Sequence, residues 1–395
     1  MLCSPRPLLA AALLVALSGT PALATWSVIA ADTVTQEVVV ASATCVTGID
    51  LAEFSPVIVV GLGGGAAQSF VDVDGSRRNI IRDGLLAGDS STEILAVLEA
   101  LGNSAFHQHG IADTGGDSAS GTGAQNGGHA SGVIGQDGTL FYAIQGNVLT
   151  GSPVVTEAEV ALLGAAGDLP TRVMAAMEAA RAHGGDGRCS CSPGNPTGCG
   201  APPPSFTKTA DVGYFIVARF GDGDDPNCNA SGCADGDYYL RLNVADQSAG
   251  DPDAVVQLQG LFDAFDLDRA GRPDGLTSPV TFSPLGNDYL LRLELRNFEG
   301  TPLGAPVVGG VTVEHAADSG MGTTIGPVTD LGDGTYEVLL TAGAVPAIDR
   351  FVITIDDGVR PAVVPPGLAT LNPGDEVFGD GLESGDTTAW DFTQP

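Results

Sequence analysis

Residues 22–44 read ALATWSVIAADTVTQEVVVASAT, and they decide how the folded chain begins. The small-x-small triplet that ends at Ala24 follows an apolar run from Leu8 to Leu17, which is the pattern of a signal-peptidase site. Alternating and β-branched residues after it predict two strands, Thr25–Ala31 and Glu37–Ala43, joined by a turn. Cleavage at this site would therefore leave the first residue of a strand as the first residue of the mature chain.

Residues 1–24 are expected to be a signal peptide of bacterial type. Their apolar run is too short to span a bilayer, and no later stretch reaches the roughly 18 to 20 apolar residues that a spanning helix needs. We therefore expect a secreted protein, periplasmic or extracellular, with no transmembrane segment.

The cysteines point to the same compartment. One of the seven, Cys3, lies in the signal peptide, which leaves an even number in the mature chain. Even numbers in an oxidising compartment predict disulfides, here three with 15 pairings open. Zinc is the rival interpretation, but no histidine lies near the paired cysteines. We expect no metal, and the disulfide candidates are Cys45, Cys189, Cys191, Cys199, Cys228 and Cys233.

The formal net charge of −32 identifies an acidic protein and argues against nucleic acid and anionic membranes as partners. A solubility role in an extracellular protein explains this charge. Calcium is the alternative at the Asp222–Asp237 loop, where aspartates are dense but fit no EF-hand spacing. We expect no cofactor, with calcium at this loop left open.

The order of predicted elements divides the chain into two domains. Residues 25–266 alternate strands with helices, which is typical of sheets covered by helices. Residues 267–279 form a polar linker rich in proline and glycine, and residues 280–372 contain strands and turns of the kind found in an immunoglobulin-like sandwich. Residues 373–395 are a tail. The sequence thus predicts an α+β domain followed by an all-β sandwich.

Two local patterns suggest ligand sites that we reject. Gly61-x-Gly63-x-x-Ala66 resembles a dinucleotide fingerprint, but Gln68–Asp74 alternates like a strand where that fingerprint needs a helix. We expect a glycine-rich turn instead. His107 and His109 share one face of a probable strand, and no carboxylate motif lies beside them to complete a metal site.

Thr25 carries chemistry of its own once the signal is removed. A threonine hydroxyl is a weak nucleophile unless a base takes its proton, and the free α-amino group of the same residue is such a base. That group has a reference pKa of about 7.7 to 8.0, whereas the same nitrogen in a peptide bond is not basic. Cleavage after Ala24 would therefore create the base that activates the Thr25 hydroxyl as a nucleophile.

The first domain resembles the DUF1028 family, described as N-terminal-nucleophile-hydrolase-like. The resemblance covers Thr25 to about Phe265 and rests on the order and spacing of short motifs. They are Thr25–Asp32, Val38–Ser42, Ala67-Gln68, Asp83–Gly88, His109–Asp113, Gly128-His129, Gln145–Leu149, Gly184–Arg188, Phe215–Arg219 and Asp251–Asp253. It implies a four-layer αββα fold and a threonine nucleophile without a known substrate. Two features depart from the family: a signal peptide replaces the usual initiator methionine, and Cys189 follows Arg188 directly.

The expected reaction is hydrolysis of an amide C–N bond of a small molecule or peptide, with Thr25 as nucleophile. Gln145 and Asn147 carry amides that could donate to an oxyanion, or they form a polar turn between strands. Further pocket or supporting positions are Gln68, His129, Asp186 and Arg188.

The alternative is a non-catalytic surface or adhesion protein. Gly326–Tyr336 resembles the Ig-like repeats of invasin-type proteins, and Val377–Trp390 resembles a tail of exported bacterial proteins, which suggests cell-surface attachment. The oligomeric state stays open.

Overall fold

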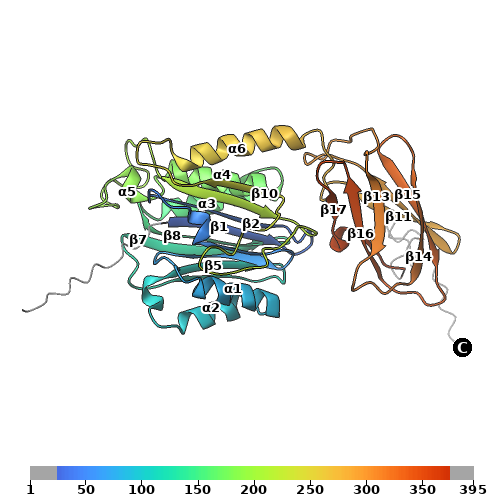
Figure 1. The fold of residues 1–395 in the computed structure, drawn as a ribbon, viewed down its shortest axis with the longest axis horizontal. Coiled ribbons are helices and arrows are strands. Elements are labelled where there is room, and N and C mark those ends of the chain that lie inside the picture. Colours follow the sequence, from blue (N-terminus) through green and yellow to red (C-terminus); the bar gives the residue numbers. More distant parts are fainter. Residues whose placement is uncertain (1–24, 374–395) are drawn as a thin grey trace, which may run out of the picture.

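A computed structural model describes residues 25–373, and the predicted signal peptide and residues 374–395 lie outside this range. The α+β domain contains two antiparallel sheets (Figure 1). The six-stranded sheet runs β10 (Leu240–Val244), β9 (Val212–Ala218), β2 (Val38–Thr44), β1 (Thr25–Asp32), β8 (Leu140–Leu149) and β7 (His129–Asp137). The four-stranded sheet runs β3 (Pro56–Val59), β4 (Gly63–Gln68), β5 (Gln108–Asp113) and β6 (Ser118–Thr122).

Helices cover the outer faces of these two sheets (Figure 1). Those on the six-stranded sheet are α3 (Pro153–Gly164), α4 (Leu169–Ala182) and α6 (Ala254–Arg269), and those on the four-stranded sheet are α1 (Ser76–Ala87) and α2 (Ser91–Glu99). Short helical turns complete the domain: η1 (Leu51–Glu53), η2 (Ser104–Phe106) and α5 (Gly187–Ser190). The inner faces of the two sheets pack on each other around their own apolar cluster.

Strand alternation in β1 decides which way Thr25 faces. Trp26 and Val28 lie in the core under α3, α4 and α6, whereas Ile29 and Ala31 lie in the core between the sheets. Because successive strand residues point to opposite faces, Thr25 faces the space between the sheets.

The glycine-rich segment is a strand, so the predicted turn over Gly61–Gly65 is wrong for most of its length. Only residues 60–62 turn, and β4 ends at Gln68, where we had expected a strand to begin. A Cβ on Gly64 would come within 2.7 Å of Val40 Cγ2 on the facing sheet. The glycines therefore allow the two sheets to approach, and they do not cradle a dinucleotide.

The second domain is a β-sandwich, which confirms the coarse prediction of an α+β domain followed by an all-β one. One sheet runs β11 (Val280–Leu285), β12 (Asp288–Glu294), β15 (Thr335–Ala342) and β14 (Thr323–Asp330). The other runs β13 (Gly310–His315), β16 (Asp349–Asp356) and β17 (Ala362–Val364), with β18 (Thr370–Leu371) also paired to β16 after the turn η3 (Pro366–Leu368). The two sheets enclose one apolar core.

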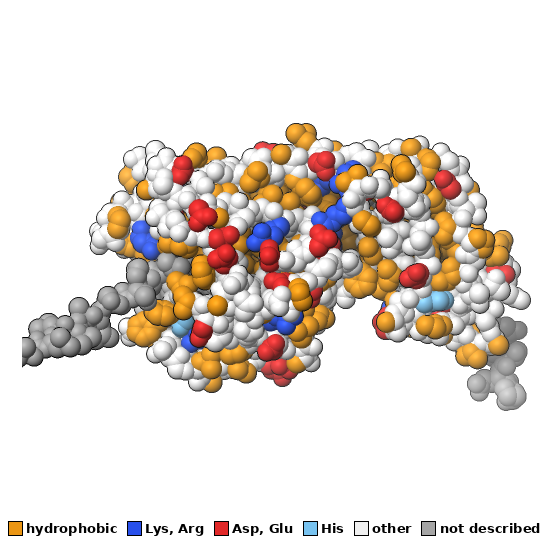
Figure 2. All heavy atoms as spheres, viewed as in Figure 1, with side chains coloured by type: hydrophobic (Ala, Val, Ile, Leu, Met, Phe, Trp, Pro, Cys, Tyr) orange, Lys and Arg blue, Asp and Glu red, His pale blue; other side chains and the backbone are white. Residues whose placement is uncertain are grey.

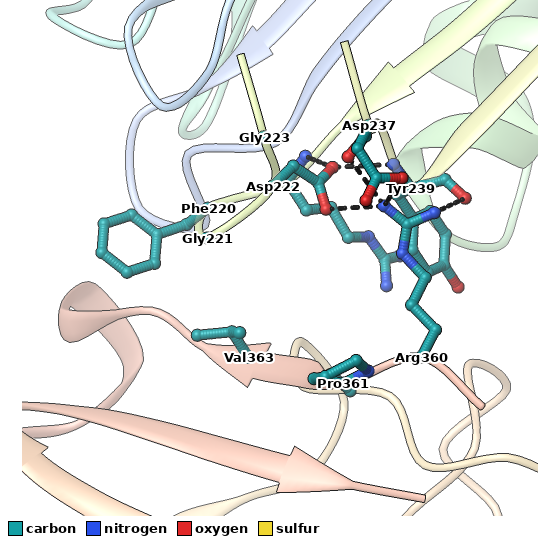
Figure 3. Close-up of a pocket in the computed structure, with 11 residues that line it drawn as sticks. Phe220, Gly221, Asp222, Gly223, Asp237, Tyr239, Arg360, Pro361 and Val363 are labelled. Carbon is teal, nitrogen blue, oxygen red and sulfur yellow. Dashed lines mark hydrogen bonds and ion pairs between the residues drawn. The ribbon is translucent and has the colours of Figure 1, made fainter. Parts of the chain in front are cut away.

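The segment between the domains is packed against both of them. Helix α6 continues to Arg269, three residues into the segment expected as linker, and Asp274 is buried. The Arg219 guanidinium lies between Glu37 and Asp274, at 2.7 Å from each carboxylate. Arg360 of the sandwich reaches the other way and donates to Asp222 at 3.1 Å, beside a cavity of about 240 Å³ (Figure 3). The ion pairs of Arg219 and Arg360 therefore connect the first domain to the segment between the domains and to the sandwich.

Candidate active site

Thr25 begins the described part of the chain and lies in a central strand. In the antiparallel register it is opposite Thr44 of β2 on one side and Asn147 of β8 on the other. Directly opposed residues in antiparallel strands point to the same face, so all three side chains enter the space between the sheets. Gln68 of the facing sheet donates from Nε2 to the Thr25 carbonyl oxygen at 3.0 Å.

Two glutamines hold that carbonyl contact in one orientation. Gln108 Nε2 donates to the carbonyl oxygen of Gly146 at 3.0 Å, which leaves its Oε1 to accept from Gln68 Nε2 at 2.8 Å. Gln68 Oε1 in turn accepts from Ser27 Oγ at 2.5 Å. Because carbonyl oxygens only accept, this chain of contacts fixes which end of the Gln68 amide meets Thr25.

Asn147 is held by a second polar chain. Its Nδ2 donates to Ser69 Oγ at 3.2 Å, and Ser69 donates to Asn126 Oδ1. Asn126 is fixed in turn by donating to the carbonyl oxygens of His107 at 3.0 Å and Gly123 at 2.8 Å. Asn147 is fully buried.

Gln145 lies between the sheets, two residues before Asn147 on β8. It is opposite Ser27 rather than Thr25, and its Oε1 accepts from Ser120 Oγ at 3.3 Å. Its Nε2 is buried and has no hydrogen-bond partner among the residues described. Gly110 makes room for it, since a Cβ there would overlap Gln145 Oε1. Gln145 is thus two residues away from Thr25 along the strand pair.

Asp186 and Arg188 close the end of the sheet beside Thr44. The Asp186 carboxylate is fully buried, pairs with Arg188 Nη2 at 2.8 Å, and accepts from the Cys45 backbone N–H at 2.7 Å. Burial raises the pKa of Asp186, and the bonds to Arg188 and Cys45 oppose that shift. Arg188 Nη2 also lies 3.4 Å from Thr44 Oγ1, so the guanidinium is next to the strand residue that opposes Thr25.

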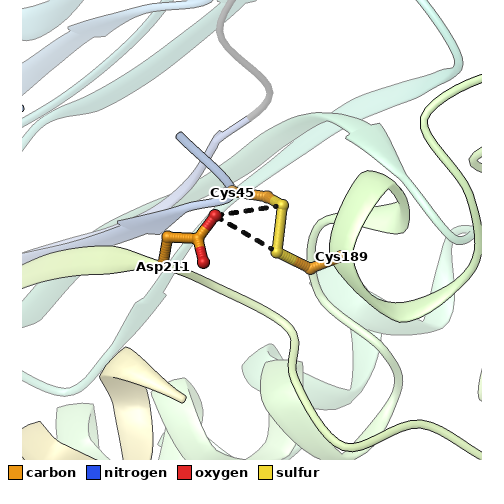
Figure 4. A group of neighbouring side chains, drawn as sticks. All are labelled: Cys45, Cys189 and Asp211. Atoms are coloured by element: carbon orange, nitrogen blue, oxygen red, sulfur yellow. Dashed lines mark hydrogen bonds between the residues drawn. A yellow bond between two sulfur atoms is a disulfide. The ribbon is translucent and has the colours of Figure 1, made fainter. Parts of the chain in front are cut away.

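All six candidate cysteines form disulfides, which confirms the disulfide prediction and resolves the pairing. The pairs are Cys45–Cys189, Cys191–Cys199 and Cys228–Cys233. The first joins the end of β2 to α5, with Asp211 beside both sulfurs (Figure 4). In these disulfides the six sulfurs carry no thiolate that could bind zinc.

His129 lies apart from the residues around Thr25. It begins β7 at the edge of the sheet, two strands from β1, and its Nε2 is 3.2 Å from Ser131 Oγ. Ser131, rather than His129, reaches the central network, because its carbonyl oxygen accepts from Gln108 at 3.1 Å.

Two patterns away from Thr25 suggested ligand sites in the sequence: the histidine pair and the acidic Asp222–Asp237 loop. His107 and His109 stack with ring centroids 5.9 Å apart on the helix-covered side of β5. In the calcium candidate loop, Asp222 accepts from two backbone N–H groups and Asp225 from two more. Acidic side chains lie scattered over both domains on the face shown in Figure 2.

Several residues of this site were missed from the sequence: Ser27, Ser42, Thr44, Ser69, Gln108 and Asn126. For Ser27 and Ser42 a signal was present, because each is a polar residue at an inward position of an otherwise apolar strand.

Comparison with known proteins identifies the first domain. Residues 25–194 match the model of a family described as "Family of unknown function (DUF1028)". The first domain therefore resembles the DUF1028 family over these residues. The family match ends within the loop after α5, whereas the first domain continues through β9, β10 and α6. No curated protein matches the chain.

Two solved structures show a weaker likeness. One is a DUF1028 protein, SPO2555 of Silicibacter pomeroyi, at 18% identity and a TM-score of 0.42, covering 62% of this chain and 89% of that one. The other is the Escherichia coli adhesin FdeC, at 8% identity and a TM-score of 0.19, covering 66% of this chain and 57% of that one. With TM-scores below 0.5, neither likeness bears on the function of the chain.

Proposed function

We propose that the protein is an exported N-terminal-nucleophile hydrolase that cleaves an amide C–N bond with Thr25. The observation that carries this proposal is the setting of Thr25. It starts a central strand, faces the space between two sheets, and is bordered there by Gln68, Asn147 and Thr44. A terminal residue placed in this way has its hydroxyl and α-amino group together among buried polar side chains.

The layering of the first domain supports the proposal. Helices on one sheet, two facing sheets and helices on the other sheet form the order that the αββα fold of such hydrolases requires. Three disulfides support export, because disulfides persist in oxidising compartments. In the described range, no helix has both the length and the apolar character needed to cross a membrane. We propose in addition that the hydrolase domain spans residues 25–266 and the sandwich domain residues 280–372.

In the proposed reaction the mature N-terminus supplies the nucleophile and the base, and water is the co-reactant. The α-amino group takes the proton of Thr25 Oγ1, which attacks the amide carbonyl and forms a tetrahedral oxyanion. The Asn147 amide donates a hydrogen bond to that oxyanion. The C–N bond then breaks, the amine leaves with the proton, and an ester remains on Thr25. Water hydrolyses this ester with the α-amino group again as the base, releasing a carboxylic acid.

The test uses the full exported chain and an alkyne-bearing β-lactone, which acylates an activated hydroxyl by ring opening. We expect labelling at Thr25 in the wild type and none in Thr25→Ala. Thr312→Ala is the matched control, because Thr312 is exposed on the sandwich strand β13 and should leave labelling unchanged. One glycine inserted before Thr25 should also abolish labelling, since it converts the base into a peptide nitrogen. Equal labelling of wild type and Thr25→Ala would overturn the proposal in favour of a non-catalytic binding protein.

A further inference from the structure

We propose that β7, an edge strand of the six-stranded sheet, pairs with β7 of a second copy of this chain and so forms a symmetric dimer. The inference concerns a surface of the first domain and is independent of the reaction proposed for Thr25. Within residues 25–373, β7 pairs with β8 on one side and with no strand on the other. The backbone groups along this open edge can therefore accept one more strand.

The strand β7 lacks the features that protect other edge strands of this protein. Exposed edges are usually blocked by shortness, proline, charge or a bulge. Strands β6 and β10 have five residues each, β11 contains Pro284, and β14 contains Pro327 within a bulge. By contrast, β7 has nine residues, none of them buried, and residues 130–136 include neither proline nor a charged side chain. Its own bulge affects only the first residues, between His129 and Ser131.

The hairpin of β7 and β8 determines which backbone groups face the open edge. A two-residue turn joins the strands, with Asp137 opposite Leu140. In such a hairpin the two residues that flank the turn form a hydrogen-bonded pair, and bonded and non-bonded pairs alternate along the strands. The residues that turn their N–H and C=O groups to the open edge are therefore Gly132, Ile134 and Gln136.

These outward groups are complementary to a second copy of the same strand. In an antiparallel pairing with Val133 opposite Val133 of the second copy, Gly132 of each chain lies opposite Ile134 of the other. Both residues face the join with their backbone groups, so they form a hydrogen-bonded pair on each side of the two-fold axis. Such an arrangement uses the same surface on both copies and closes as a dimer.

The local charges permit this pairing although the chain carries a formal net charge of −32. The two-fold axis places the His129 end of each strand beside the Asp137 end of the other. The Asp137 carboxylate is paired with Arg172 at 2.7 Å, and the Glu159 carboxylate of α3 accepts from the Tyr142 hydroxyl at 2.9 Å. The acidic groups near the join thus have partners within their own chain, and each Asp137 meets an imidazole rather than another carboxylate.

An apolar face of α3 supports the same join independently. Helix α3 contacts β7 and β8, and α4 packs on its other flank. Val160 is 62% exposed and Leu163 is 41% exposed, and their spacing places both on one face of α3. Paired strands lie about 4.8 Å apart, so a join at β7 brings the two α3 helices to roughly 10 Å, the distance at which helices pack. One two-fold axis therefore covers both the open strand edge and this apolar face.

The test measures the mass of the mature full chain by sedimentation velocity over a wide range of concentration. We expect the wild type to sediment as a dimer that dissociates on dilution. The main variants are Ile134→Lys and Val160→Lys. Val133 packs under the helices, so Ile134 lies on the opposite face of the sheet from Val160. Each variant should raise the Kd of the dimer about 10- to 100-fold.

Leu285→Lys is the matched control and should leave the Kd unchanged. Leu285 is 57% exposed on β11, an edge strand of the sandwich, and Ile134 is 51% exposed on β7. Far-UV circular dichroism checks that each variant is folded. Should Ile134→Lys fail to fold, Val160→Lys still tests the join from an exposed helix position.

Hydrogen exchange separates strand pairing from a contact between helices alone. Residues 131–137 should exchange more slowly in the wild-type dimer than in monomeric Val160→Lys, because pairing engages the outward N–H groups. A wild type that is monomeric at every concentration would overturn the proposal. So would a dimer whose Kd neither lysine variant changes, one that Leu285→Lys weakens equally, or one in which β7 exchanges as fast as in the monomer.

Discussion

The buried carboxylate of Asp186 accepts a hydrogen bond from the backbone N–H of Cys45 at 2.7 Å, across 141 residues of sequence. The same carboxylate pairs with Arg188, and the Cys45–Cys189 disulfide closes the group covalently. The end of β2 next to Thr25 is thus fastened to α5 by a backbone hydrogen bond and a disulfide, and the pair with Arg188 holds the accepting carboxylate in place. Each of these contacts is expected to contribute to the free energy of unfolding.

Asp186→Asn should destabilise the fold by about 2 to 3 kcal/mol, because the amide has a single acceptor oxygen in place of the two carboxylate oxygens that serve Cys45 and Arg188, and it removes the buried charge that attracts the guanidinium. Urea unfolding of the variant and wild type at neutral pH measures this difference. The matched control is Asp137→Asn, whose carboxylate pairs with Arg172 at 2.7 Å but is 51% exposed. That change should cost less than about 1 kcal/mol, and equal losses in the two variants would contradict the fastening role of Asp186.

The three disulfides should contribute unequally to stability. Cys45–Cys189 spans 144 residues of sequence, whereas Cys228–Cys233 spans 5. In the chain-entropy treatment a crosslink stabilises more when it closes a longer loop, which gives about 5 kcal/mol for the first pair and about 2 kcal/mol for the second. Replacing each pair by serines and comparing urea unfolding tests this order. A larger loss on removing Cys228–Cys233 would contradict it.

Acid should destabilise the first domain through two buried histidines. Burial, followed by the charge on Arg77, lowers the pKa of His107 to about 4 and that of His109 to about 3, from a usual value of 6.5. Because the folded-state pKa values are depressed, the stability that these residues contribute is complete above pH 6.5 and is lost as the pH falls towards 4 and 3.

His109→Gln removes one of these titrating groups and should flatten the dependence. Urea unfolding of the variant and wild type between pH 7 and pH 4.5 provides the measurement. We expect the two unfolding free energies to converge, or to cross, as the pH falls, since the wild type buries two histidines that protonate when unfolded and the variant retains only His107. A constant difference over this range would show that His109 is not held neutral by the fold.

Much of the fold could be predicted from the sequence because its periodicity is regular. Alternation in Thr25–Ala31 and Glu37–Ala43 located the central strands. In the structure the first extends to Asp32, and the second is shifted by one residue to Val38–Thr44. Asp168 caps α4 and Ser90 caps α2, and both are residue types that favour the N-terminal end of a helix. The glycine segment Gly63–Gln68 was misread, because the reason for its glycines is contact with a sheet formed by distant residues.

Less of the candidate active site than of the fold could be predicted from the sequence. Gln68 and Asn147 lie 79 residues apart, and only the packing of one sheet on the other brings both to Thr25. Ser69 and Asn126 had no local signal, since their importance lies in a chain of hydrogen bonds between loops and strands. His129 shares a motif with Gly128 but belongs to an edge strand, and strand order does not follow from a short motif.

The central claim is that removal of the signal peptide creates the nucleophile and its base together, and the intact mass of the exported protein tests it most directly. Expression with export and purification from the periplasm or medium, followed by mass spectrometry and N-terminal sequencing, gives the first residue of the mature chain. We predict a chain that begins with Thr25 and carries three disulfides. A mature chain that begins at any other residue would contradict the mechanism, because the α-amino group would then be absent from Thr25.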